Sequence, residues 1–388
     1  MKELSIKVLG AGPSGSLLAI ALANSNTKVY LFDILDMEKL LSRDRSYAIT
    51  HSTRRLLEKL GIWSELKNKA IPFKELSVLD SVINKSIVLS TKDLNESNYK
   101  SNAVGWTIDH KILMEVLFEK INISNQINLQ LNCLKIKDDI DYDYHFAADG
   151  ISSKSRNKWN IGTYSYRYRQ KCITFKALLR VNHSNRAYEI FRKEGPMAIL
   201  PMGNDLYQVI ISSPSSICEN LITLPTSLFL DKVSTLLPSG IEIDSLYNNP
   251  EVFPLALSVS KKLIVANKFL VGESAHSLHP VGGQGLNLSI RDINALTLLL
   301  NDRKNRNHIG LISKRSKSFF ILNRYIDILS TSFLTHILIV IFSNSFTVFR
   351  FIRYLTFILL RKAPYLRRLL LSLFTDGFSF LFAKRLDS

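Results

Sequence analysis

The sequence predicts an α/β protein in three parts: a Rossmann-like domain, an inserted and mainly antiparallel β-sheet domain, and a helical C-terminal region. Three observations lead to this prediction. A strand, a glycine turn, a helix and a second strand open the chain, as in a βαβ unit. Strand-like segments with partial apolar alternation occupy much of residues 166–261. The last part of the chain holds apolar stretches bracketed by cations.

Composition places the chain among globular proteins and locates its positive charge. The 388 residues are 46% hydrophobic and 21% charged, which is too apolar for a disordered chain. Residues 301–388 contain 15 Lys and Arg against 4 Asp and Glu, so +11 of the total charge of +17 lies in the tail. Such charge suits nucleic acid, an anionic membrane or phosphate-bearing ligands. No recognised nucleic-acid motif accompanies it, so we expect no nucleic-acid partner.

Cysteine usage and the N-terminus point to a reducing compartment. Cys133, Cys172 and Cys218 lie far apart, without a CxxC pair or a nearby His at ligand spacing. This pattern predicts neither a disulfide framework nor a metal site. The N-terminus runs directly into a strand and a glycine turn, with no basic and apolar leader ahead of a cleavage site. We therefore expect a cytoplasmic protein without a bound metal.

The first motif, GAGPSG, lies between a strand and a helix and predicts a phosphate-binding turn. In this GxGxxG pattern the first glycine allows the turn, the second lets the backbone approach a pyrophosphate, and the third lets the helix pack closely on the strand. An aspartate at the end of the second strand can accept hydrogen bonds from a ribose. The residues predicted to bind the cofactor here are Gly10, Gly12, Pro13, Ser14, Gly15 and Asp33.

Two further motifs predict a longer ligand than a nicotinamide cofactor alone. FAADGISSKSR carries Asp149 after a strand end, and KFLVGESAHSLHPVGGQGLN carries Glu273 after another. The glycines of the GGQG segment precede a helix from about Leu286, so its N-terminus can face an anion. Three loops that converge on one ligand favour FAD.

These motifs resemble those of the FAD-dependent aromatic hydroxylases, in the branch that serves ubiquinone biosynthesis. GAGPSG, RDRSYAI, ADGISSKSR, GPMAILP and the C-terminal stretch each match, and LHPVGGQGLNLSIRD matches the most diagnostic segment almost letter for letter. Glu273 stands where the family usually has Asp, which keeps the carboxylate. The resemblance implies a Rossmann-like FAD-binding domain with further cofactor contacts from Arg45, Asp149, Glu273, Pro280, Gly283, Gly285, Leu286 and Asn287.

The activity that the resemblance implies is hydroxylation of an aromatic ring, on a prenylated quinone precursor, by O₂ through a flavin hydroperoxide. No second GxGxxG is present for a nicotinamide, so NAD(P)H would bind transiently or a ferredoxin-type donor would replace it. No catalytic side chain is assigned, because His276 and His279 are expected to shape the pocket wall or to hydrogen-bond locally. The alternatives are a flavin reductase or cyclase acting on an isoprenoid without oxygen insertion, and a catalytically silent scaffold.

The motifs divide the chain into discontinuous domains. We expect Ile210, Met197 and Ile199 either to line a channel for a prenyl chain or to form sheet core. The FAD-binding domain is expected at 1–72, 100–165 and 262–305, the substrate domain at 73–99 and 166–261, and the helical region at 306–388.

The tail predicts a peripheral attachment to the inner face of a membrane. Its longest apolar run, Ile328–Phe342, has about 15 residues, fewer than the ~20 that a spanning helix needs. A second apolar stretch, FIRYLTFILL, is bracketed by cations, as in helices that lie on an anionic bilayer. The alternative is a set of core-packing helices with a basic outer face.

Overall fold

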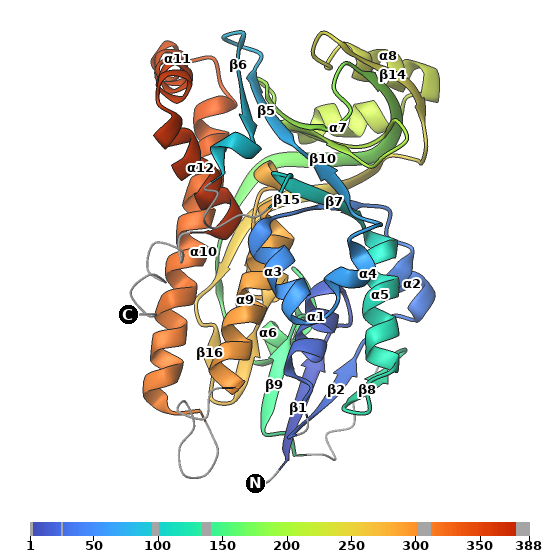
Figure 1. Cartoon of the computed structure of the whole chain (residues 1–388), viewed down its shortest axis with the longest axis vertical. Coiled ribbons are helices and arrows are strands. Elements are labelled where there is room, and N and C mark those ends of the chain that lie inside the picture. Colours follow the sequence, from blue (N-terminus) through green and yellow to red (C-terminus); the bar gives the residue numbers. More distant parts are fainter. Residues whose placement is uncertain (1–2, 25, 95–100, 134–140, 302–311, 378–388) are drawn as a thin grey trace.

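A six-stranded sheet at one end of the molecule and a nine-stranded sheet at the other frame the part of the chain that the structure describes (Figure 1). This computed structural model describes residues 3–24, 26–94, 101–133, 141–301 and 312–377. A long C-terminal helix runs beside both sheets and connects the two ends of the molecule (Figure 1).

The six-stranded sheet is parallel except at one edge, where β16 pairs with β17 in the antiparallel sense. Its order is β16 (Ile264–Val265), β17 (Lys268–Leu270), β9 (Tyr144–Ala147), β1 (Leu4–Leu9), β2 (Thr27–Phe32) and β8 (Ile127–Gln130). Helix α1 (Pro13–Leu22) packs between α5 (His110–Asn122) and α9 (Gln284–Asn301). Buried aliphatic side chains of these helices and of β1 and β2 form the main core, as expected for a Rossmann-like layer.

The nine-stranded sheet is mainly antiparallel and has one parallel pair, β11 with β5. Its path is β18 (His276–Ser277), β15 (Glu251–Ser260), β10 (Thr163–Val181), β13 (Leu206–Pro214), β12 (Met197–Pro201), β11 (Arg186–Phe191), β5 (Glu75–Asp80) and β6 (Lys85–Ser90), and β14 (Ile241–Leu246) pairs with β10. Helices α7 (Ser215–Ile222) and α8 (Thr226–Ser234) close a separate core on one face.

Short elements join the two large sheets. A three-stranded sheet is formed by β3 (Ser46–Ile49), β7 (Gly105–Asp109) and β4 (Ile71–Phe73). Around it and the loops lie α2 (Met37–Leu41), α3 (His51–Lys59), α4 (Trp63–Leu66), α6 (Lys154–Lys158) and the 3₁₀ turns η1 (Thr91–Asp93), η2 (Gly272–Ser274) and η3 (Val281–Gly283). The Asp109 carboxylate caps α5 by accepting a hydrogen bond from Lys111 N–H at 2.8 Å.

The C-terminal region is helical over the residues that the structure describes. It consists of α10 (Lys314–Phe342), α11 (Thr347–Lys362) and α12 (Pro364–Asp376). Proline at the first position of α12 and Gly377 after its end, at φ 73°, set its bounds. Residues 306–311 and 378–388 of the region assigned from the sequence lie outside the described residues.

Helix α10 corrects the prediction that the apolar run Ile328–Phe342 is too short to span a bilayer. That run is the second half of a 29-residue helix, whose length and composition alone would suffice to cross a membrane. Its first half, however, buries Arg324 and Asp327 in ion pairs, so this part of α10 packs against protein.

A network of buried charges joins α10 to α9. Arg324 donates to Asp292 Oδ1 at 2.8 Å and to Asp327 Oδ2 at 2.8 Å, and Arg291 donates to the same Asp327 oxygen at 2.8 Å. On its other side Asp292 accepts hydrogen bonds from His276 and from the N–H of Gly272. The network therefore connects the C-terminal region directly to the loop that follows β17.

A second buried ion pair fastens α11 to the nine-stranded sheet. Arg353 of α11 and Asp80 at the end of β5 are both fully buried, with Nη1 3.2 Å from the Asp80 carboxylate. The same guanidinium donates to the carbonyls of Phe342, Asn344 and Phe349. At least part of the tail's positive charge therefore holds the helices in place, and does not form a basic outer face.

Candidate active site

The three motifs meet at one edge of the six-stranded sheet. They follow β1, β9 and β17 directly, and these strands are parallel neighbours. Because the carboxyl ends of parallel strands lie together, the loops converge there. A Cβ on Gly10 would lie 3.0 Å from Asp149 Cα, and one on Gly272 would lie 3.1 Å from Ser14 Oγ. The convergence expected from the sequence is therefore present in the fold.

The GAGPSG turn contains two glycines that packing requires and one that borders open space. A Cβ on Gly15 would lie 1.7 Å from the carbonyl oxygen of Gly10, and Gly10 itself has φ 97°. Gly12, by contrast, has φ −68°, and a Cβ there would meet nothing within 4 Å. It lies at the N-terminus of α1, which has no side-chain cap. Open space at an uncapped helix N-terminus fits a phosphate.

Asp33 holds the glycine turn with one carboxylate oxygen and the segment after β2 with the other. Oδ2 accepts from Ala11 N–H at 2.6 Å, and Oδ1 accepts from Leu35 N–H at 2.8 Å. Each oxygen keeps a second lone pair, so the ribose contact stays a prediction.

The second motif places a carboxyl oxygen without a partner beside this turn. Asp149 Oδ2 accepts from Ser155 N–H at 3.0 Å, whereas Oδ1 is buried and has no hydrogen bond among the described residues. A buried polar atom of this kind calls for a ligand or solvent partner. Arg156 of the same motif donates to the carbonyl of Ser274 at 3.0 Å and so ties the second motif to the third.

The third motif begins with Gly272 in the left-handed region and continues to exposed Glu273. Gly272 N–H donates to Asp292 Oδ2 at 3.1 Å, and His276 Nε2 is 2.7 Å from the same oxygen. Burial raises the pKa of Asp292, but the charges of His276 and Arg324 outweigh it and lower that pKa to about 2. Asp292 is therefore an anion at neutral pH, and its role is to hold the loop.

The GGQG loop is fixed to β3 and α3 by one amide side chain. Gly282 and Gly283 have φ 69° and 60°, and α9 begins at the next residue. Asn287 donates to the carbonyls of Ala48 at 2.7 Å and Gly283 at 2.9 Å, and it accepts from Thr53 at 2.7 Å. Its amide group is therefore engaged by protein partners, and a cofactor contact from Asn287 is left to its main chain.

The other predicted contacts lie around this loop. Pro280 and Gly283 line an adjacent cavity. A Cβ on Gly285 would meet nothing within 4 Å, and Leu286 is half-buried against the main core. Arg45 precedes β3, with its guanidinium 5.9 Å from the ring centroid of Tyr47. The structure thus brings these residues to one region, and their contacts with FAD stay predictions.

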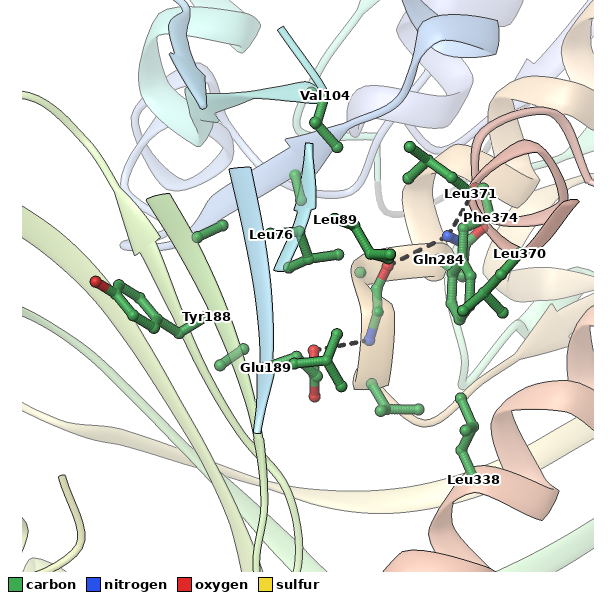
Figure 2. Close-up of a pocket in the computed structure, with 18 of the residues that line it drawn as sticks. Leu76, Leu89, Val104, Tyr188, Glu189, Gln284, Leu338, Leu370, Leu371 and Phe374 are labelled. Atoms are coloured by element: carbon green, nitrogen blue, oxygen red, sulfur yellow. Dashed lines mark hydrogen bonds between the residues drawn. The ribbon is translucent and has the colours of Figure 1, made fainter. Parts of the chain in front are cut away.

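An apolar cavity of about 270 Å³ adjoins the GGQG loop (Figure 2). One wall is the nine-stranded sheet, where Val78, Glu189, Ala198 and Ile210 form a row across β5, β11, β12 and β13. The facing wall comes from α10, α11 and α12, with the side chains Leu338, Phe342, Phe357, Leu360, Leu370, Leu371 and Phe374. The C-terminal helices therefore build one wall of the cavity.

The channel residues expected from the sequence divide between the two faces of the sheet. Ile210 lines the cavity, as predicted. Met197 and Ile199 do not, because they point into the core beneath α7 and α8, while Ala198 and Leu200 face the cavity. Adjacent side chains of a strand point to opposite faces of the sheet. A prediction that is shifted by one residue along the strand therefore assigns each side chain to the wrong face.

Glu189 is the one carboxylate among the described residues that line the cavity, and the sequence analysis missed it. Its Oε2 accepts a hydrogen bond from Gly282 N–H at 3.2 Å (Figure 2). Burial raises the pKa of Glu189 to about 8, against the opposing effect of the Gly282 N–H. The signal in the sequence was a lone acid within the strand RAYEIF, whose other positions are nearly all apolar.

Neither histidine of the third motif lines the cavity, so neither is placed to act there as a general base. His276 is paired with buried Asp292. Burial lowers the pKa of His279 to about 3, and its Nδ1 accepts from Val281 N–H at 3.3 Å, so this ring is neutral at physiological pH. Both histidines hydrogen-bond locally, whereas neither is among the residues that line the cavity.

Taken together, the three loops fit FAD. The open space at Gly12, the partnerless oxygen of Asp149 and the space at Gly285 lie in the loops that the motifs assign to a dinucleotide. The third of these loops ends at the apolar cavity, where a second ligand has room beside the GGQG loop.

Comparison with known proteins gives matches over most of the chain. A family model described as an FAD binding domain matches residues 132–304, which include the second and third motifs. Ubiquinone hydroxylase UbiL of Rhodospirillum rubrum is 25% identical, and the match covers 76% of this chain and 72% of the relative. The 3-demethoxyubiquinol 3-hydroxylase of Escherichia coli is 24% identical, with 77% and 80% covered.

A solved structure shares the fold. p-Nitrophenol 4-monooxygenase PnpA of Pseudomonas putida superposes with a TM-score of 0.78 at 16% identity, and the match covers 96% of this chain and 97% of that one. The predicted fold class, a Rossmann-like domain with an inserted mainly antiparallel sheet and a helical C-terminal region, is confirmed.

Proposed function

We propose that this protein, an FAD-dependent monooxygenase related to the hydroxylases of ubiquinone biosynthesis, hydroxylates the aromatic ring of a prenylated quinone precursor. The observation that carries the proposal is the apolar cavity between the GGQG loop and the C-terminal helices. An apolar substrate bound in this cavity would lie beside the loop that the motifs assign to the cofactor. Its lining of Leu, Ile, Val and Phe side chains suits a prenyl chain better than a charged metabolite.

In this proposal the bound cofactor activates O₂, and the chain positions the ring and keeps water away. Gly12 leaves room for the diphosphate, while Gly10 and Gly15 allow the turn and the close packing of α1. Asp33, Arg45, Asp149 and Glu273 supply polar contacts to the rest of FAD. Further contacts come from loop residues, namely Pro13, Ser14, Pro280, Gly283, Gly285, Leu286 and Asn287. The apolar walls exclude water from the reacting atoms. A transient NAD(P)H supplies the electrons.

The test is a reaction under ¹⁸O₂ with purified protein, NADH or NADPH and a 2-polyprenylphenol, analysed by mass spectrometry. We expect one labelled oxygen atom in the product. Reaction under ¹⁶O₂ in H₂¹⁸O is the control and should leave the product unlabelled. Reduction or cyclisation of the substrate without label would reject the hydroxylase in favour of the flavin reductase or cyclase, and no turnover of any isoprenoid would favour the silent scaffold.

The substrate class suggests a membrane partner, and α11 offers a surface for it. Val348, Phe351, Ile352, Leu355 and Leu359 recur at helical spacing on one side of α11 and are all exposed, Phe351 to 67%. The opposite side carries buried Arg353 and Phe357. Exposed cations, Arg350, Arg361, Lys362 and Arg368, lie on α11 and α12. An apolar face with cations nearby fits the surface of an anionic bilayer.

We expect the wild-type protein to bind vesicles that contain phosphatidylglycerol, and to bind them less as salt rises, because cations near the surface are screened. The double variant Val348→Glu/Phe351→Glu should lose binding by at least tenfold, since two charges would enter the apolar layer. Leu298→Glu, at an exposed leucine of α9, is the matched control and should bind like the wild type. Co-sedimentation measures all three. Equal binding by the double variant and the control would remove α11 from the attachment.

A further inference from the structure

We propose that Glu189 is a catalytic residue that accepts the proton of the substrate's ring hydroxyl group, through the carboxyl oxygen not bonded to the GGQG loop. The inference rests on the proposed function, because it assumes that the ring occupies the cavity described above.

The position of Glu189 follows from the sheet register. Glu189 pairs with Val78 on β5 and with Ala198 on β12, and Ala198 pairs with Ile210 on β13. All four line the cavity, so the carboxyl group rises from an otherwise apolar row. Figure 2 shows it between the sheet and the loop, with the dashed line to the Gly282 N–H.

The two oxygens of Glu189 differ in their surroundings. Oε2 accepts from Gly282 N–H at 3.2 Å, which fixes the carboxyl group beside the loop. Oε1 makes no hydrogen bond with the described residues, and protein atoms do not cover it completely. Oε1 is thus accessible from the cavity. As the one carboxylate among the described lining residues, Glu189 is the strongest hydrogen-bond acceptor that the cavity offers to a ring hydroxyl group.

The charges around Glu189 leave it poised to gain and lose a proton. On β5, Asp80 is neutralised by Arg353 of α11. The lining residues from η3, α9, α10 and α12 carry no charge. Tyr188, the other titratable lining residue, has a pKa raised by burial and points away from the cavity in Figure 2. Burial therefore dominates and raises the pKa of Glu189 to about 8. A base with a pKa near the operating pH is well matched to proton transfer.

The proposed step is a proton transfer. The O–H bond of the ring hydroxyl breaks, a bond from Oε1 to hydrogen forms, and the electron pair stays on the ring oxygen. The negative charge raises the electron density at the ortho and para ring carbons, which favours electrophilic oxygen insertion. The C–H bond of the hydroxylated carbon then breaks, and its electron pair makes the ring aromatic again. The hydrogen leaves as a proton to the solvent, which balances the second oxygen atom of O₂ as it ends in water, and the proton on Glu189 returns to the ring oxygen.

The test compares the wild type with Glu189→Gln, which keeps the size of the side chain and an oxygen for the Gly282 N–H but cannot accept the proton. Wild-type kcat/KM should rise with pH through an apparent pKa of about 8. In Glu189→Gln the rate of labelled product formation should fall by ~100-fold or more, and this limb should vanish. FAD content should be unchanged. Glu194→Gln, at an exposed acid after the same strand, is the control and should match the wild type.

A binding measurement separates this inference from the proposed function. Titration of a 2-polyprenylphenol into oxidised enzyme at pH 8.5 should produce phenolate absorbance with the wild type and none with Glu189→Gln. Glu189→Asp, which retains an acid, should restore part of it and also serves if the glutamine variant misfolds. Equal rates and pH profiles in wild type and Glu189→Gln would overturn the role of Glu189 and leave hydroxylation intact. Absence of labelled product from the wild type would instead reject the proposed function.

Discussion

A Gly12→Val variant is expected to fold normally and to lose FAD. Gly12 has φ −68° and ψ −176°, a conformation that valine adopts readily, and a Cβ there would meet no protein atom within 4 Å. The added side chain would instead fill the space at the N-terminus of α1 that we assign to the pyrophosphate. Affinity for FAD should fall by ~100-fold or more, which corresponds to ~2.7 kcal/mol.

Flavin absorbance of the purified variant and titration of its apo form with FAD measure this loss, and thermal unfolding without FAD reports on the fold. Gly162→Val is the matched control, because Gly162 also has no positive φ and would place its Cβ 3.4 Å from the flexible end of Lys261. It should retain FAD. A yellow Gly12→Val protein with wild-type affinity would show that the pyrophosphate lies elsewhere.

The second large effect is expected from Arg353→Met. Removing the guanidinium leaves the fully buried Asp80 carboxylate without its cation and leaves the carbonyls of Phe342 and Asn344 without a donor. Breaking a buried ion pair on one side costs ~3–5 kcal/mol. Because Arg353 joins α11 to β5, the loss should loosen the helices that form one wall of the cavity, and hydroxylation should decline with it.

Denaturant unfolding measures the loss of stability, and limited proteolysis of α11 and α12 reports whether these helices are loosened. Arg350→Met, at an exposed cation of the same helix, should leave the free energy of unfolding nearly unchanged. The double variant Asp80→Asn/Arg353→Met should recover part of the stability, since it no longer buries an unpaired charge. If Arg353→Met unfolds like Arg350→Met, the ion pair does not hold the C-terminal helices.

The sequence was most informative where backbone geometry demands glycine. The turn at Gly10 and Gly15 and the loop at Gly282 and Gly283 need close approach or positive φ. Glycine at these positions therefore indicates the backbone conformation directly. Parallel strands then explain why motifs 120 or more residues apart along the chain meet at one edge. The cofactor half of the site could be predicted for these reasons.

The substrate half could not be predicted, because its residues act through tertiary contacts. The phase of β12 decided that Leu200, and not Ile199, faces the cavity, and apolar residues on both faces of a strand hide that phase. The raised pKa of Glu189 comes from burial, and its position is fixed by the N–H of Gly282, a residue far along the chain. Arg353 looked like one more surface cation until its partner Asp80 was found on β5.

The buried charges that join α9 to α10 imply an order of events on the ribosome. A nascent chain that ends near residue 300 presents Asp292 without Arg324 beside it, although Asp292 must hold the N–H of Gly272. Domains usually mature from the N-terminus while synthesis continues. Here the first 300 residues contain all three cofactor motifs, yet the last of their loops is completed by a helix translated later. Ribosome-bound chains released from the tunnel only to residue 300 should therefore retain little FAD in a flavin fluorescence assay, whereas chains extended beyond α10 should retain it.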